Sequence, residues 1–106
     1  MLLAAIAVIV ALFATAAYAA TITGTDKSDI LIESQRNDTI DGQGGDDTLR
    51  AGKFPFDTDN LDGGTGIDTL NAADGDNRDT LDGGAGEDAC KGDPLDTYEN
   101  CEYTEK

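Results

Sequence analysis

Beyond its first twenty residues, the chain repeats a short unit in which an acidic residue precedes one apolar residue. The unit is Asp-x-apolar, as in Asp47-Thr48-Leu49 and Asp68-Thr69-Leu70. Its apolar positions are 31, 40, 49, 61, 70, 81, 90 and 101, which gives spacings of 9, 9, 12, 9, 11, 9 and 11. Such self-similarity is typical of a repeat protein. Because every second gap is nine, the full repeat is a pair of half-turns, each made of one loop and one short strand.

This pattern predicts an all-β fold with few residues per strand. Successive strands would fall alternately in two facing parallel sheets, and one apolar residue per strand would stack on its equivalent one turn later. We expect a short coil of about four full turns. In this register the last unit is Glu99-Asn100-Cys101, so that Cys90 and Cys101 would face each other across the final turn.

The first twenty residues form a separate segment, because they are almost all apolar and include no charged side chain. Ala17-Tyr18-Ala19 fits the small-x-small rule for cleavage of a secretory signal peptide. We therefore predict a signal peptide over residues 1–19 and a single mature domain over residues 20–106. The alternative is an uncleaved membrane anchor, since about 20 apolar residues can span a bilayer. Either interpretation places the remaining chain outside the cytoplasm.

The charge of the chain excludes several functions. It has 22 acidic residues, seven basic residues and no histidine, for a net charge of −15. Binding to nucleic acid through its phosphates needs a positive surface, so this class is excluded. Imidazole catalysis and histidine-ligated zinc are also excluded. The acidic groups must be solvated, or they must hold cations.

Three glycine-rich loops precede the repeated aspartates and favour cation binding. They are GQGGDD (42–47), GGTGID (63–68) and GGAGED (83–88). Glycine permits positive φ and close backbone approach, so carbonyl oxygens can converge. A carboxylate at a fixed offset completes an oxygen cage that suits a hard cation such as calcium.

These loops resemble the RTX family of hemolysin-type calcium-binding repeats, whose motif is Gly-Gly-x-Gly-x-Asp-x-apolar-x. GGTGIDTL (63–70) fits fully, GGAGEDAC (83–90) has cysteine at the apolar position, and GQGGDDTL (42–49) has glutamine at the second position. The resemblance covers roughly residues 22–101. It implies a right-handed parallel β-roll that holds Ca2+ between glycine-rich loops on successive turns.

Carried onto this sequence, the resemblance places calcium mainly along one edge of the roll. The loops of the other edge, over residues 33–38, 50–59 and 71–79, lack the glycine pattern. The expected metal-site residues are Asp47, Asp68, Asp88, Gly42, Gly45, Gly63, Gly66, Gly83 and Gly86, with a weaker contribution from Asp29.

The two cysteines predict a disulfide, which is the default for a cysteine pair in a secreted chain. A bond between Cys90 and Cys101 would contribute roughly 2–3 kcal/mol. Packed sheets lie about 10 Å apart, whereas disulfide-bonded Cα atoms lie about 5.5 Å apart, so the last turn would have to narrow. A zinc or redox pair is disfavoured, because no other soft ligand is present.

The sequence therefore predicts a secreted, non-enzymatic protein whose partner is the calcium ion and which folds on binding it. No nucleic acid, and no membrane after signal cleavage, is expected as a partner. Two alternatives stay open: an adhesion module of the cell surface or matrix, and the detached repeat tail of a secreted hydrolase.

Overall fold

The structure is a computed structural model that describes residues 7–11, 21–33, 37–52, 56–75 and 78–106. These residues form eleven short strands and no helix. The strands are β1 (Ala7–Ala11), β2 (Thr21–Thr23), β3 (Asp29–Glu33), β4 (Thr39–Asp41), β5 (Thr48–Arg50), β6 (Asn60–Asp62), β7 (Thr69–Asn71), β8 (Thr80–Asp82), β9 (Ala89–Lys91), β10 (Thr97–Glu99) and β11 (Tyr103–Glu105).

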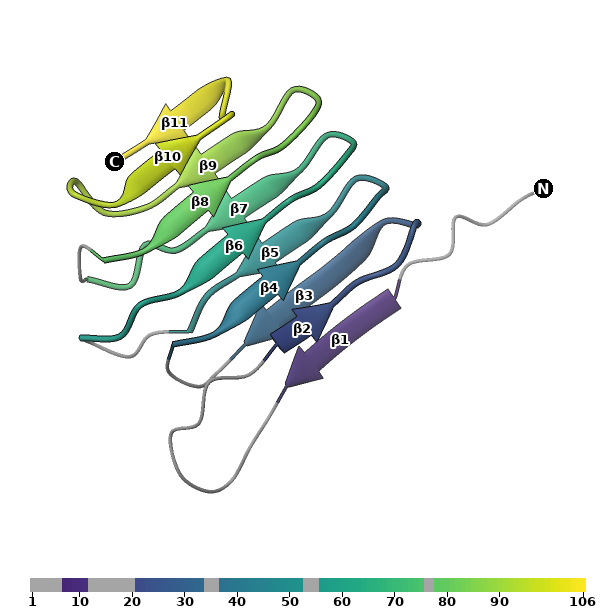
Figure 1. Cartoon of the computed structure of the whole chain (residues 1–106), viewed down its shortest axis with the longest axis horizontal. Coiled ribbons are helices and arrows are strands. Elements are labelled where there is room, and N and C mark those ends of the chain that lie inside the picture. The colour runs from purple at the N-terminus through teal and green to yellow at the C-terminus, as the bar shows by residue number, and fades with distance from the viewer. Residues whose placement is uncertain (1–6, 12–20, 34–36, 53–55, 76–77) are drawn as a thin grey trace.

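The strands alternate between two parallel sheets, which we call sheet A and sheet B. Sheet A has the order β1-β3-β5-β7-β9-β11, and sheet B has the order β10-β8-β6-β4-β2. Each strand therefore pairs with the strand one full turn away, and the chain winds as a stack of flat turns (Figure 1). The predicted all-β parallel roll of about four turns is confirmed.

The core of the roll is a double row of single side chains, one from the centre of each strand from β2 to β9. In sheet A, Leu31, Leu49 and Leu70 pair in register and end at Cys90. In sheet B the corresponding row is Ile22, Ile40, Leu61 and Leu81. All these side chains are buried, which confirms the inward positions predicted between residues 31 and 90. Because each turn supplies two core residues, every turn depends on the turns beside it.

The predicted last unit is wrong by three residues. Tyr98, not Cys101, pairs with Leu81, because Asp96-Thr97-Tyr98 forms the last copy of the repeat after a shorter half-turn. Asp96 is buried and accepts a hydrogen bond from the backbone of Asp79, as a repeat aspartate does. The tyrosine also donates from its hydroxyl to a loop carbonyl, which closes the exposed end of sheet B.

The predicted disulfide is present, although its geometry differs from the expected one. Cys101 follows β10 in the connection to β11, and its Cα atom lies 5.9 Å from that of Cys90. Since the chain is already crossing from sheet B to sheet A at this point, the two cysteines meet between the sheets.

Part of the predicted signal peptide also forms a strand. β1 pairs in parallel with β3 over five residues, from Ala7 with Asp29 to Ala11 with Glu33. The other residues of segment 1–19 lie outside the described residues, and cleavage after residue 19 stays a prediction. Among the residues that the structure describes, no helix is long and apolar enough to span a bilayer.

Candidate metal centre

The loops that join the sheets lie along two opposite edges of the roll. The glycine edge consists of the loops from sheet B to sheet A, over residues 24–28, 42–47, 63–68, 83–88 and 100–102. The aspartate edge consists of the described parts of the loops from sheet A to sheet B, over residues 37–38, 51–52, 56–59, 72–75, 78–79 and 92–96. The glycine edge forms the regular series of loop tips on the right of Figure 1.

In the loops 63–68 and 83–88, close stacking on the preceding turn depends on glycine at the second and fourth positions. Gly64 and Gly66 have φ values of 86° and 121°, in the left-handed region that disfavours other residues. A Cβ atom on Gly66 would lie 2.0 Å from the carbonyl oxygen of Gly45 in the adjacent turn. Gly84 and Gly86 repeat both features. The glycine pattern is thus a requirement of stacking in these two loops, whereas loop 42–47 has Gln43, with a φ of 73°, at its second position.

Hydrogen bonds between backbones hold these stacked loops in register. The amide of Thr65 donates to the carbonyl of Gln43 at 2.9 Å, and the amide of Ala85 donates to that of Gly64 at 2.9 Å. Gly66 in turn donates to Ala85 at 3.0 Å. The loops therefore extend the hydrogen bonding of the sheets, and this bonding fixes the distance between equivalent groups in adjacent loops.

The aspartates predicted as ligands form one continuous row beneath these loops. The backbone amide of Asp29 donates to Oδ1 of Asp47, that of Asp47 to Oδ1 of Asp68, and that of Asp68 to Oδ1 of Asp88, each at 2.8 Å. All four side chains are no more than 2% exposed. The structure thus brings the four predicted carboxylates together, one per turn.

The second carboxylate oxygen of three of these aspartates has no protein donor. Oδ2 of Asp47, Asp68 and Asp88 is buried and accepts no hydrogen bond within the described part of the chain. A Cβ atom on Gly42 would lie 2.6 Å from Oδ2 of Asp47 and 2.7 Å from the carbonyl oxygen of Gly63. The first glycine of the loop therefore leaves room in which a carboxylate oxygen and a backbone oxygen from the next turn converge.

The same convergence recurs along the edge. The Cβ position of Gly63 lies 2.6 Å from Oδ2 of Asp68 and 2.8 Å from the carbonyl oxygen of Gly83. At Gly83 the neighbours are Oδ2 of Asp88 and a backbone carbonyl of the last turn. Orphaned buried carboxylate oxygens beside carbonyl oxygens fit a hard cation, which such sites hold through oxygen ligands alone.

Without a cation, this row favours protonated carboxyl groups. Burial, as the largest cause, and the neighbouring carboxylates of Asp88 and Asp47 together raise the pKa of Asp68 to about 7, although the hydrogen bond from the amide of Asp47 lowers it. Burial likewise raises the pKa of Asp47 to about 6, and it raises the pKa of Asp88. A bound divalent cation would supply the positive charge that the folded row lacks.

Protein groups replace the missing partners at both ends of the row. At the first turn, the backbone amide of Thr25 and its hydroxyl, at 3.0 Å, both donate to Oδ2 of Asp29. At the last turn, Glu102 accepts the amide hydrogen bond of Asp88 at 2.8 Å. Sequence reasoning missed Glu102, because Thr104 stands at the apolar position of this last turn, so that Glu102-Tyr103-Thr104 does not match Asp-x-apolar. The saturated oxygen of Asp29 offers a physical reason for the weaker site that was expected there.

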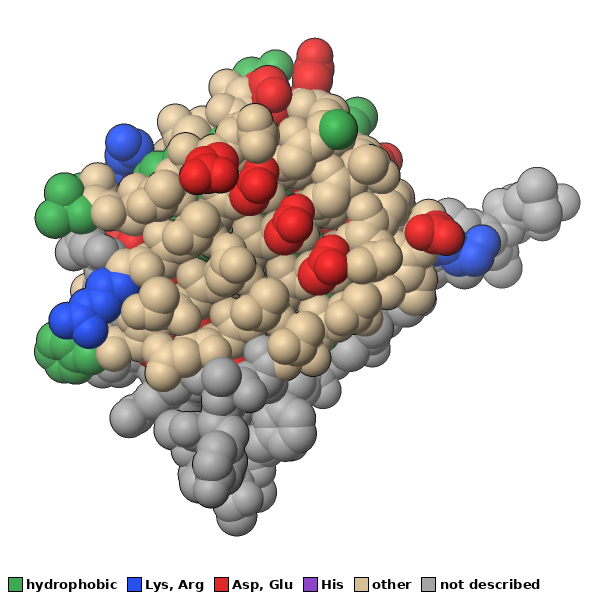
Figure 2. All heavy atoms as spheres, viewed as in Figure 1, with side chains coloured by type: hydrophobic (Ala, Val, Ile, Leu, Met, Phe, Trp, Pro, Cys, Tyr) green, Lys and Arg blue, Asp and Glu red, His purple; other side chains and the backbone are tan. Residues whose placement is uncertain are grey.

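A further row of acidic residues lies directly before the glycine-rich loops. Asp41, Asp62 and Asp82 pair in register at the ends of their sheet B strands, and each accepts a hydrogen bond from the amide two residues later. These hydrogen bonds shape the first turn of each loop. Figure 2 shows acidic side chains in a row across successive turns. Burial raises the pKa of Asp62, and its two neighbours in the row raise it further.

The aspartate edge repeats the carboxylate row without the glycines. The amide of Asp38 donates to Oδ1 of Asp59 at 2.8 Å, and that of Asp59 to Oδ1 of Asp79 at 2.7 Å. Asp79 donates to Oδ1 of Asp96 at 3.1 Å, which ends the row. Both edges therefore have the same ladder of amide-to-carboxylate hydrogen bonds.

Two additional carboxylates join this second row. One oxygen each of Asp57, Asp59, Asp74 and Asp79 lie within 4.8 Å of one another. Three of these side chains are buried, and Asp74 is partly exposed. Sequence reasoning missed this cluster, because Asp57 and Asp74 lie in loops that depart from the glycine pattern. The available signal was that each lies a few residues before a repeat aspartate.

A parallel β-roll with buried rows of oxygen ligands at its loops defines a repeat protein of the cation-binding class. The family of RTX calcium-binding nonapeptide repeats matches residues 23–54 and 56–90, as four copies. The chain therefore belongs to this family, as its motifs indicate. No curated protein and no solved structure matched the chain.

Proposed function

We propose that this protein is a secreted, non-catalytic roll that binds Ca2+ along its glycine edge and folds when it does so. The observation that carries the proposal is the set of buried Oδ2 atoms of Asp47, Asp68 and Asp88, which have no protein donor in the described part of the chain. Gly42, Gly63 and Gly83 keep the space beside these oxygens open. A family whose repeats bind calcium supports the choice of cation.

The donor set favours calcium over transition metals. The polar atoms nearest to these positions are carboxylate and carbonyl oxygens, which suit a hard cation with many oxygen ligands. Both cysteines are joined in the disulfide, so they offer no thiolate. The carbonyls of Gly63 and Gly83 and the carboxylates of Asp47 and Asp68 would hold the ion between adjacent turns.

Calcium would also supply much of the folding free energy. The described residues have only nine buried apolar side chains, and rows of carboxylates are buried at both edges, where they repel one another as at Asp68. A small domain with so little apolar burial usually depends on a metal or on disulfides. Binding to a site that exists only in the folded chain adds its free energy to folding.

The aspartate edge offers a second location for calcium. The four clustered carboxylates at Asp57, Asp59, Asp74 and Asp79 bring more negative charge to one point than any single glycine loop does. We therefore extend the proposal to this cluster, where carboxylates take the place of backbone carbonyls. Calcium would then bind at both edges, and not mainly at one.

Secretion rests on two supports. The first is the apolar segment 1–19 with its small-x-small end, and the second is the disulfide, which is typical of oxidising compartments. Calcium at extracellular levels would suffice for sites of modest affinity.

The proposal is tested by circular dichroism and calorimetry of the secreted chain. We expect a β spectrum with calcium that is lost when EDTA is added. Asp47→Asn with Asp68→Asn should abolish most binding at the glycine edge. Glu87→Gln, at an exposed acidic position of the same edge, is the matched control and should bind as the wild type does. A β spectrum that EDTA leaves unchanged, together with wild-type stoichiometry in the double variant, would overturn the proposal.

A further inference from the structure

Sheet A has a hollow on its outer face near the C-terminal end of the roll. The groove has a volume of about 350 Å³ and lies across β7, β9 and β11. Two rows of side chains line it, because the three strands pair in register. One row is Thr69, Ala89 and Tyr103, and the other is Asn71, Lys91 and Glu105.

A break in the outer row produces the hollow. The two preceding turns have Thr48 and Thr69 at this position, and the next turn has Ala89. The smaller side chain lowers the floor of the groove between Thr69 and Tyr103. Tyr103 is 62% exposed, so its ring is available as an aromatic wall.

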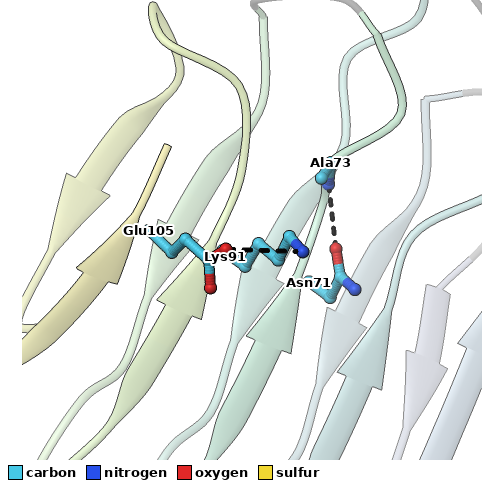
Figure 3. A network of polar contacts seen from close by, with 4 residues as sticks. All are labelled: Asn71, Ala73, Lys91 and Glu105. Carbon is cyan, nitrogen blue, oxygen red and sulfur yellow. Dashed lines mark hydrogen bonds and ion pairs between the residues drawn. The ribbon is translucent and has the colours of Figure 1, made fainter.

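The second row supplies polar groups of both kinds. The amide oxygen of Asn71 accepts a hydrogen bond from the backbone of Ala73 at 3.0 Å, so its NH2 group is the part of the side chain that can donate to a ligand. The ammonium group of Lys91 lies 3.7 Å from a carboxylate oxygen of Glu105, and both side chains are at least half exposed. Figure 3 shows these groups across the three neighbouring strands.

We propose that this groove binds a neutral pyranose ring of a glycan. A pyranose presents a face of C–H groups and an edge of hydroxyl groups. The C–H face suits the negative face of the Tyr103 ring, and the hydroxyl groups can accept from Asn71 and Lys91 and donate to Glu105. The groove therefore matches both surfaces of one ring at once.

Size and charge restrict the ligand further. Small-molecule sites measure about 300–1,000 Å³, so the groove suits a ligand near the lower limit, such as one sugar ring. Lys91 and Glu105 neutralise each other, and the chain has a net charge of −15, which repels acidic sugars. Neutral hexoses are thus favoured over uronic or sialic acids.

The test is a titration of the full chain, at saturating calcium, followed by amide chemical shifts in NMR spectra. The probes are the methyl glycosides of glucose, galactose and mannose, and glycerol is the polyol control without a ring face. We expect at least one glycoside to shift amides of β7, β9 and β11, whereas glycerol leaves them unchanged. No shift with any glycoside at tens of millimolar would overturn the proposal.

Three variants locate the binding. Ala89→Thr continues the threonine row and fills the hollow, so it should remove the shifts. Tyr103→Ala should weaken binding by at least about fivefold, whereas Tyr103→Phe should retain it, because the ring face does not need the hydroxyl. A response of Ala89→Thr equal to that of the wild type would contradict the proposal. So would equal binding by the two Tyr103 variants, which stays informative if Ala89→Thr folds poorly.

Discussion

The two edges of the roll differ in how they surround their carboxylates, although both use the same ladder of hydrogen bonds. At the glycine edge, each turn contributes one buried aspartate and a backbone carbonyl beside a glycine, as at Asp68 and Gly83. At the aspartate edge, the carboxylates of Asp57 and Asp74 come within 4.8 Å of the row instead. The comparison teaches that the stacking of turns produces the ladder of hydrogen bonds at either edge. The sequence of each loop decides which further oxygen atoms lie beside that ladder.

At the ends of the ladders, residues outside the repeat pattern interact with the terminal carboxylates. Thr25 saturates the first carboxylate of the glycine edge, and Glu102 ends that row. At the aspartate edge the last carboxylate, Asp96, accepts amide hydrogen bonds on both of its oxygens, from Asp79 and Asp93. In the interior turns, Oδ2 of Asp47, Asp68 and Asp88 has no such donor among the residues that the structure describes. Protein groups thus take the place of a neighbouring repeat turn at these three ends.

The largest expected effect comes from a side chain placed between stacked loops. Gly66→Ala combines a positive φ with a Cβ atom 2.0 Å from a carbonyl oxygen, so it should cost about 3 kcal/mol or more of folding stability. The measurement is chemical unfolding at saturating calcium.

Gly75→Ala is the matched control at the aspartate edge. Gly75 also has a positive φ, of 105°, but a Cβ atom there would meet nothing within 4 Å. Its substitution should cost only about 1 kcal/mol. If the two variants were equally stable, loop stacking would not distinguish the edges.

The next effect separates calcium at the two edges. Asp57→Asn with Asp74→Asn removes two charges of the cluster while keeping side-chain size, so calorimetry should show the loss of one calcium site. Binding at the glycine edge should persist, because none of its ligands changes. An unchanged stoichiometry in this variant would confine calcium to the glycine edge.

Acidity should stabilise the calcium-free roll. On folding, the pKa of Asp68 rises from 3.8 to about 7 and that of Asp47 from 3.8 to about 6. Between the unfolded and the folded pKa of each group, the folded chain therefore holds more protons than the unfolded chain. Stability therefore falls as pH rises from about 4 to about 7. Calcium-free samples should show more β structure by circular dichroism at pH 5 than at pH 7.5, and Asp47→Asn with Asp68→Asn should remove most of this difference.

The smallest effect concerns the cap of the first carboxylate. Thr25→Val removes the hydroxyl that donates to Asp29 and keeps the backbone amide, so it should cost about 1 kcal/mol in thermal unfolding. Calcium stoichiometry should not change. A marked change in stoichiometry would show that Thr25 and Asp29 belong to a metal site rather than to the cap.

Much of the fold was predictable because the core residues recur at short, regular intervals along the chain. Leu49, Leu70 and Leu81 recur after a repeat aspartate, and a side chain that must stack on its equivalent leaves such a period in the sequence. The register failed at Cys101 because the last half-turn is shorter, and an exposed terminal turn has no later turn to keep its length constant. The predicted disulfide was nevertheless correct, because two cysteines need only lie close together and need not occupy equivalent strand positions.

The sequence by itself determined the parallel roll, its inward row of apolar residues, the glycine edge and the calcium-binding family. These features repeat from turn to turn, because each residue of the stack must match its equivalent in the next turn, and the repetition makes them recognisable in the sequence. Only the tertiary structure decided that Asp57 and Asp74 join Asp59 and Asp79, that donors cap Asp29, and that Ala89 opens a groove beside Tyr103. These features occur once each, and they depend on which side chains meet across turns, which a period along the chain does not encode.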